Sequence, residues 1–279
     1  MKNIIVLIDN AVNSEHLALS AMNIAVKIGA NIILVHASKK NNADDELTEM
    51  SIEQLNEKGG LEAIANDIET KLEKSGDNAS ATKVHCLMYR GSVANLLAEQ
   101  TKDGAIDLVI IGSHQSGEWE KVMFRTQMQD ILENIGCPLL VIPRKFIMGA
   151  IRKTIFAVNL AIGYKNALRY VVAFSASFDS KVLVNHISKL GFPEKPSEED
   201  LRNEVNLSLD PNLPAVAFHS IRSTDVKTAL LETMETGDVD LLCLVHRNYN
   251  FLRAIFHRSV SNRLANNAVI PVMVLQESY

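Results

Sequence analysis

The sequence predicts an α/β protein of two similar halves, each with a parallel sheet flanked by helices. Short apolar runs rich in β-branched residues alternate with longer segments of helical periodicity, which is typical of a parallel sheet with crossover helices. Glycine or small polar residues follow several of these runs. The order of runs in the first half of the 279 residues then recurs in the second half.

The stretch from Asp107 to Pro143 organises the first half. LVII at 108–111 is typical of a buried parallel strand, and Gly112 permits a tight turn at its end. Residues 126–135 have the periodicity of a helix with one apolar face, and Gly136 is expected to act as its C-cap. Because backbone N–H groups gather where such a strand ends, this loop is a candidate site for an anion or a phosphate.

The same stretch recurs from Asp240, 133 positions after Asp107. At this spacing Arg258 aligns with Arg125, and Ser259 with Thr126. The beginnings of the halves align at 150 positions instead, so the second half has a shorter middle. This ordered set of matches predicts two copies of one unit, at residues 1–146 and 150–279.

Each half is expected to follow the same order of elements. The expected strands of the first half are 4–8, 32–35, 84–88, 108–111 and 139–142. Its first expected helix is capped at Asn13 or Ser14, and three further helices are expected at 50–74, 93–102 and 126–135. In the second half the expected strands include 154–158, 181–186, 215–219 and 272–275, with helices at 165–176 and 224–236.

Composition excludes several classes of protein. A net charge of −5 argues against a nucleic-acid binder, which usually presents a basic surface. No apolar run has the length of a membrane span, and Asp9 interrupts the first run too early for a signal peptide. The three cysteines, Cys86, Cys137 and Cys243, form neither a disulfide framework nor a metal motif. These features predict a cytoplasmic protein without a metal site.

Each half resembles a universal stress protein domain, and the chain as a whole resembles a tandem universal stress protein. The resemblance rests on residues 4–38, the Gly91 turn, DLVIIGSH at 107–114 and CPLLVIP at 137–143. It implies two Rossmann-like domains of the adenine nucleotide alpha hydrolase-like type, each with a parallel five-stranded sheet. It also implies a stress-response function without catalysis, in which some members bind ATP.

The resemblance transfers a candidate adenine-nucleotide site to the first half. The residues are Asp9 after the first strand, Ala37 after the second, the loop residues Gly112, Ser113 and His114, and finally Arg125 and Thr126. Two of the three glycines that wrap phosphates in ATP-binding members are replaced, by Gln115 and Arg125. Arg125 would either obstruct a triphosphate or, with the neighbouring hydroxyl, hold a single phosphate. The alternative is that Arg125 and its counterpart Arg258 each form a salt bridge with a neighbouring carboxylate across the domain interface.

The second half departs further from that signature. Asn159 replaces the aspartate, Val245 replaces the first glycine, and no glycine occurs between His246 and Ser259. The second domain is therefore interpreted as degenerate. His36 and His186 stand at equivalent places, and since neither has a visible nucleophile or carboxylate beside it in the sequence, a hydrogen-bonded structural role is expected for both.

Three functions remain open from the sequence. The first is a non-catalytic stress-response protein whose first domain binds an adenine nucleotide or a smaller anion such as phosphate. The second is a scaffold or interaction module in which both sites have decayed, and the third is a weak ATPase. The apolar strands 139–142 and 272–275 are predicted to pair, making an intramolecular pseudo-dimer, and a homodimer remains open.

Overall fold

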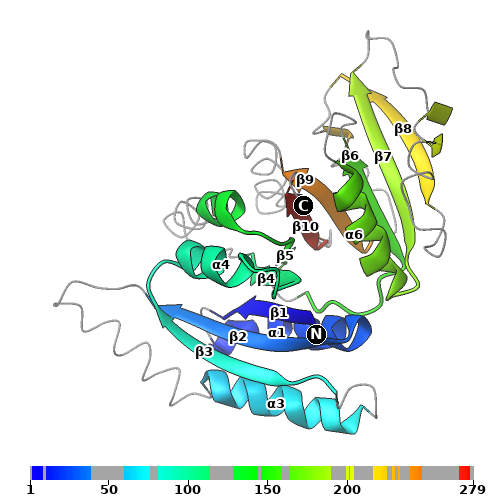
Figure 1. Ribbon diagram of the computed structural model, residues 1–279. Coiled ribbons are helices and arrows are strands. Elements are labelled where there is room, and N and C mark those ends of the chain that lie inside the picture. Colours follow the sequence, from blue (N-terminus) through cyan, green and yellow to red (C-terminus); the bar gives the residue numbers. More distant parts are fainter. Residues whose placement is uncertain are drawn as a thin grey trace. The chain divides into compact units, whose positions relative to one another are not determined.

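The protein is described by a computed structural model in which the chain divides into two compact units, Met1–Gly149 and Ala150–Tyr279 (Figure 1). The structure describes residues 2–8, 11–38, 60–75, 81–113, 128–143, 146–158, 164–189, 199–200, 202–203, 216–224, 228–229, 232, 239–246 and 270–276. Each unit is considered by itself below.

The first unit contains the predicted parallel sheet. Its strands are β1 (Lys2–Leu7), β2 (Ala30–Ser38), β3 (Val84–Arg90), β4 (Leu108–Gly112) and β5 (Leu139–Ile142). They lie in the order β3-β2-β1-β4-β5, and every pairing among them is parallel. The strand order therefore reverses next to β1, because β2 lies on one side of β1 and β4 lies on the other.

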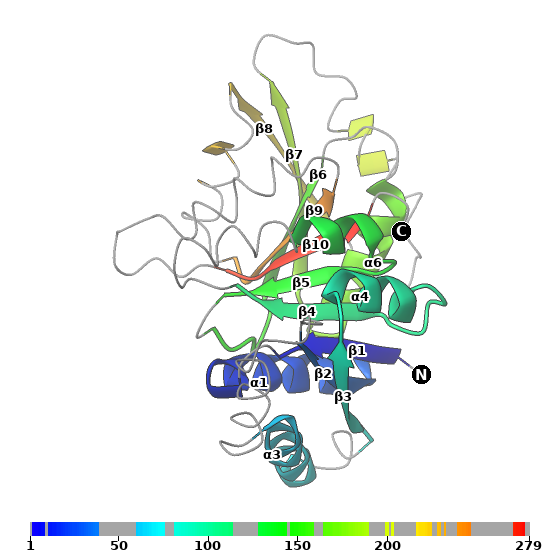
Figure 2. The same ribbon diagram turned by 90° about the vertical axis from the view of Figure 1, so that its left-hand side faces the viewer.

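Helices cover both faces of this sheet. They are α1 (Ala11–Ile28), α3 (Leu61–Lys74), α4 (Val93–Thr101) and a helical turn at 128–134. Helices α1 and α3 contact each other, and right-handed crossovers place them on the face opposite α4 (Figure 2). The four apolar residues predicted to form the buried face of the last helix, Met128, Ile131, Leu132 and Ile135, are all buried, which confirms the helical pattern.

The second unit repeats this arrangement. Its strands are β6 (Lys153–Val158), β7 (Lys181–Lys189), β8 (Ala217–Ser223), β9 (Leu241–His246) and β10 (Val272–Gln276), in the order β10-β9-β6-β7-β8 with parallel pairings. Helix α6 (Tyr164–Ala176) follows β6, as α1 follows β1. The predicted fold class, two α/β units of the same design, is confirmed.

Several predicted boundaries are wrong. Strand β2 continues through Ser38, because its hydrogen-bonded pairing with β3 extends to Ser38 and Arg90. His36 and Ala37 consequently lie within the strand and not after it. Helix α1 begins at Ala11, so Asn13 and Ser14 lie in its first turn and not before it. These differences arise because strand ends are set by pairing with distant segments and not by local composition.

Gly136 also differs from its expected role as a left-handed helix cap. It does not have a positive φ angle, whereas Gly29 after α1 has a φ of 66°. A Cβ on Gly136 would lie 2.9 Å from the carbonyl oxygen of Thr101, and its N–H donates to the Thr101 hydroxyl over 2.9 Å. Glycine at this position therefore lets the chain approach the end of α4 closely.

One aspartate performs the same structural task in each unit. Asp107 donates its backbone N–H to the Asn3 carbonyl over 2.9 Å, and its carboxylate accepts the Asn3 N–H over 3.0 Å. Asp240 repeats both bonds with Lys153, each over 3.0 Å, and also accepts the N–H of Arg152 over 2.7 Å. The repeated aspartate noticed in the sequence thus ties the chain before β4 and β9 to the central strand.

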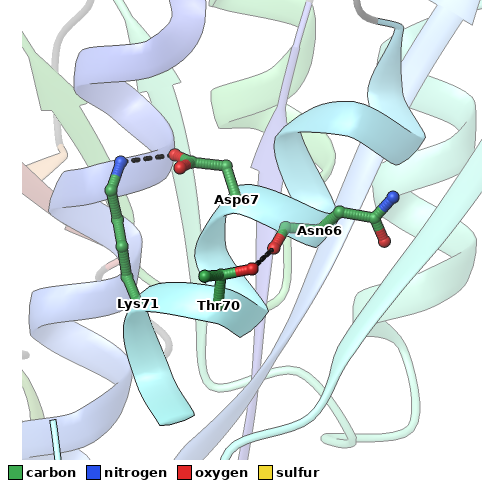
Figure 3. Close-up of polar contacts among 4 residues, drawn as sticks. All are labelled: Asn66, Asp67, Thr70 and Lys71. Atoms are coloured by element: carbon green, nitrogen blue, oxygen red, sulfur yellow. Dashed lines mark hydrogen bonds and ion pairs between the residues drawn. The ribbon is translucent and has the colours of Figure 1, made fainter. Parts of the chain in front are cut away.

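The exposed side of α3 is stabilised locally. Lys71 forms an ion pair with Asp67 one turn earlier, and the Thr70 hydroxyl donates to the Asn66 carbonyl over 2.8 Å (Figure 3). Pairs at this spacing contribute only a few tenths of a kcal/mol each. Most of the packing energy of the helix comes from its other side, where four residues are buried: Leu61, Ala65, Ile68 and Leu72.

No helix among the described segments combines the length and the apolar character that crossing a bilayer requires.

The three cysteine thiols differ in burial, and their reactivity can therefore be used to test the structure. Cys137 and Cys243 are buried, and Cys86 is exposed as a residue. The Cys86 sulfur nevertheless lies against α3, 3.6 Å from the Leu61 carbonyl oxygen. Desolvation raises the pKa of the Cys86 thiol, and the carboxylates of Glu62 and Glu69 raise this pKa further. Burial raises the pKa of Cys137 to about 12.

We therefore expect Cys86 to be alkylated first, but more slowly at pH 8 than an unperturbed cysteine. A raised pKa lowers the fraction of reactive thiolate. Replacing Glu62 and Glu69 together by glutamine should lower this pKa and accelerate alkylation by about two- to tenfold. Iodoacetamide labelling followed by peptide mass spectrometry measures the rate, and Cys86→Ala identifies the signal. An unchanged rate in the double variant would contradict the assignment of the carboxylates.

Candidate functional site

The candidate site lies at the carboxyl ends of β1, β2 and β4 in the first unit. Parallel α/β sheets bind ligands where the strand order reverses, and here that point lies between β1 and β4. Ile8 follows β1 and Gly112 ends β4, so both border this point. Ala37 is the half-buried penultimate residue of β2. The structure therefore places Ala37, Gly112 and Ser113 at one edge of one sheet.

Ser113 is held in place by the neighbouring strand. Its backbone N–H donates to the carbonyl of Ile142 at the end of β5, over 2.9 Å. This N–H is thus engaged within the sheet. The residue as a whole is half-buried.

Gly112 has a packing role that the sequence did not indicate. A Cβ on Gly112 would lie 3.0 Å from Cδ1 of Leu17 on α1. At the equivalent positions of the second unit, Val245 replaces Gly112 and Ala167 replaces Leu17, so a larger strand residue accompanies a smaller helix residue. Leu17 and Ala167 are both buried. The absence of a side chain at Gly112 therefore serves helix–sheet packing as well as any approach of a ligand.

The remaining predicted site residues lie outside the described residues. These are Asp9, His114, Arg125 and Thr126. Their assignment to a nucleotide or anion site stays a prediction. Among the described parts of the chain, no group of three or more histidine, cysteine, aspartate or glutamate side chains is arranged to hold a metal ion.

The two equivalent histidines have the structural role expected from the sequence. His36 Nδ1 lies 2.8 Å from the carbonyl oxygen of Ile8, and His186 Nδ1 lies 3.3 Å from that of Val158. Because a carbonyl oxygen can only accept, Nδ1 carries the proton in both rings. Each histidine therefore links the second strand of its domain to the end of the first strand, and it fixes the chain immediately before the Asp9 or Asn159 position.

One polar residue was missed by sequence reasoning. Asn185, in the middle of β7, is fully buried, and within the part of the chain that the structure describes neither its amide nitrogen nor its amide oxygen has a hydrogen-bond partner. Comparison of the two halves could have indicated this residue, because Asn185 stands 150 positions after Val35 and is polar where Val35 is apolar.

Comparison with solved structures supports the fold. A universal stress protein from Archaeoglobus fulgidus matches with a TM-score of 0.72 and 14% identity, over 98% of this chain and 96% of that one. A functionally unknown protein from Pseudomonas aeruginosa matches with a TM-score of 0.59 and 12% identity, over 99% and 92%. The cytoplasmic domain of a prokaryotic cation chloride cotransporter matches with a TM-score of 0.58 and 8% identity, over 99% and 96%. No curated protein matches the sequence.

The fold and its repeat define a tandem of two Rossmann-like α/β domains. In each domain the carboxyl ends of the parallel strands lie at one edge of the sheet. The model of the universal stress protein family matches this chain twice, at residues 1–143 and 151–276. The chain therefore belongs to the universal stress protein family, with two family domains in tandem.

Proposed function

We propose that this tandem universal stress protein acts without catalysis, by binding one adenine nucleotide or a smaller anion in its first domain. The observation that carries the proposal is the difference between the two carboxyl edges. The first domain has Gly112 at the end of β4 and Ala37 near the end of β2, with Asp9 directly after Ile8. The second domain has Val245 in place of the glycine and Asn159 in place of the aspartate.

The proposed contacts follow from the chemistry of these residues. The Asp9 carboxylate would accept hydrogen bonds from ribose hydroxyls, and the backbone at Ala37 would contact the base. The Ser113 hydroxyl and the His114 side chain would lie beside the phosphates, where Gly112 leaves the strand end without a side chain. Arg125 and Thr126 would provide a charge-assisted fork and a hydroxyl, suited to one phosphate group.

A substitution in the first domain tests this proposal against a matched change in the second. Isothermal titration of the full chain with ATP should give one site per chain. Asp9→Asn, which introduces the residue that the second domain already carries, should weaken binding by about tenfold or more, the scale of a lost charge-assisted hydrogen bond. Asn159→Ala should leave the affinity unchanged. Two sites per chain, or a loss caused by Asn159→Ala, would reverse the assignment.

An interaction module without a nucleotide is the second candidate. It is favoured by the packing of Leu17 against Gly112, which gives the glycine a purpose that requires no ligand. It is favoured also by the replaced glycines at Gln115 and Arg125. If neither ATP nor inorganic phosphate binds the full chain in titration, this candidate replaces the first. Slow hydrolysis of ATP by the full chain, abolished by Asp9→Asn, would instead support a weak ATPase.

A further inference from the structure

The two domains differ along one row of side chains that crosses three neighbouring strands. In the first domain the strand register aligns Leu7 with Val35 and Val35 with Leu87. All three residues are apolar. Since residues paired in this way point to the same face of a parallel sheet, they form one continuous apolar row.

In the second domain the same row is polar. Its register aligns Ala157 with Asn185 and Asn185 with His219. Ala157 stands where the first domain has Leu7, so three carbon atoms are lost beside a position that gains a carboxamide. His219 stands where the first domain has Leu87. The row thus combines a smaller side chain, an amide and an imidazole on adjacent strands.

The amide of Asn185 is the decisive group. The residue is completely buried, and among the described residues neither its donor nor its acceptor has a hydrogen-bond partner. A buried amide is normally paired, because leaving it unpaired costs free energy that an apolar residue would not cost. Val35 shows that the same fold accommodates an apolar residue at this position, fully buried. Packing alone therefore does not account for the asparagine at this position.

We propose that the second domain binds a small uncharged molecule whose adjacent hydrogen-bond donor and acceptor pair with the amide of Asn185. A carboxamide or the amino edge of a purine has this pattern. Ala157 presents a smaller side chain beside the amide than Leu7 presents beside Val35, and His219 supplies a further donor or acceptor. The row contains no carboxylate, lysine or arginine, so it favours an uncharged ligand over a phosphate. The ligand enters at the outer end of the row, where His219 is exposed on the edge strand β8.

The site is distinct from the nucleotide site proposed for the first domain. It lies in the other domain and uses an amide where the first domain has an aliphatic side chain. It also does not require the glycines that wrap phosphates, which the second half lacks. Failure of ATP to bind the first domain would leave this inference unaffected.

Nuclear magnetic resonance of the full chain tests the inference directly. Adenine and nicotinamide serve as the two probes, since they present the same donor–acceptor pattern on different rings. One of them should shift the side-chain amide resonance of Asn185 in a saturable manner, with the resonance assigned by its loss in Asn185→Val. Small probes of this size bind weakly, so titration into the millimolar range is needed.

A control variant restores the row of the first domain. Ala157→Leu, Asn185→Val and His219→Leu are combined, because the first domain shows that this set packs within the same fold. Probe affinity should fall by about tenfold or more in the triple variant. Asn185→Leu provides a second variant, which keeps the size and removes both the donor and the acceptor, and it should also weaken binding. Equal affinity of the parent and the triple variant, or no shift of the amide resonance by either probe, would overturn the inference.

Discussion

Replacing Val35 by asparagine should lower the free energy of unfolding of the first domain by about 3 to 5 kcal/mol. Val35 is completely buried, so the change forfeits about 2 kcal/mol of apolar burial. It also places an amide among Leu7 and Leu87, where the row offers it no partner, at a cost of about 1 to 3 kcal/mol. Urea unfolding followed by circular dichroism gives the total, and hydrogen exchange of the β2 amides assigns the loss to the first domain.

Val35→Ala is the control for this prediction, because it removes apolar contacts without adding a polar group. The asparagine variant should be less stable than the alanine variant, and equal stability would show that the amide finds a partner. The reciprocal change, Asn185→Val, should raise the stability of the second domain by about 1 to 3 kcal/mol, since it removes an unpaired buried amide. This gain is expected whether or not Asn185 binds a ligand, because it refers to the unliganded protein.

Replacing Asp240 by alanine should lower the free energy of unfolding of the second domain by about 1 to 3 kcal/mol. One carboxylate oxygen of Asp240 accepts the N–H groups of both Arg152 and Lys153, at 2.7 and 3.0 Å. Hydrogen bonds to a charged acceptor contribute more to stability than bonds between neutral groups. Because Asp240 is only half-buried, solvent screening reduces the stability that is lost when its carboxylate is removed. The same urea titration, with exchange of the β6 amides as the local readout, measures the effect.

Asp240→Asn should cost less than Asp240→Ala, because the side-chain carbonyl remains as an acceptor while the charge is lost. Asp103→Ala, a change at an exposed position after α4, should be close to neutral and serves as the control. Asp107→Ala should destabilise the first domain by a similar mechanism, since Asp107 binds Asn3 as Asp240 binds Lys153. An effect of Asp240→Ala no larger than that of Asp103→Ala would contradict the anchoring role.

The candidate nucleotide site was only partly accessible to sequence reasoning. The resemblance to universal stress proteins implied which strand ends would carry it, and Ala37, Gly112 and Ser113 lie at one edge of the first sheet. The role of Gly112 in packing against Leu17 was not predictable, because it depends on where a helix lies over a strand 95 positions later in the chain. Asp9, His114, Arg125 and Thr126 remain predictions. The pairing of strands 139–142 and 272–275 also remains a prediction.

By itself the sequence determined the fold class, the duplication and the two equivalent histidines. Local periodicity specifies strands and helices, and a repeated order of motifs specifies a repeated fold, because both signals are carried by residues close together in the chain. Only the tertiary structure decided which side chains share a space. Strand register brings Ala157, Asn185 and His219 into one row and Leu7, Val35 and Leu87 into another. Register is set by pairing between segments far apart in sequence, so neither the polar row nor its unpaired amide is apparent from any single stretch of the chain.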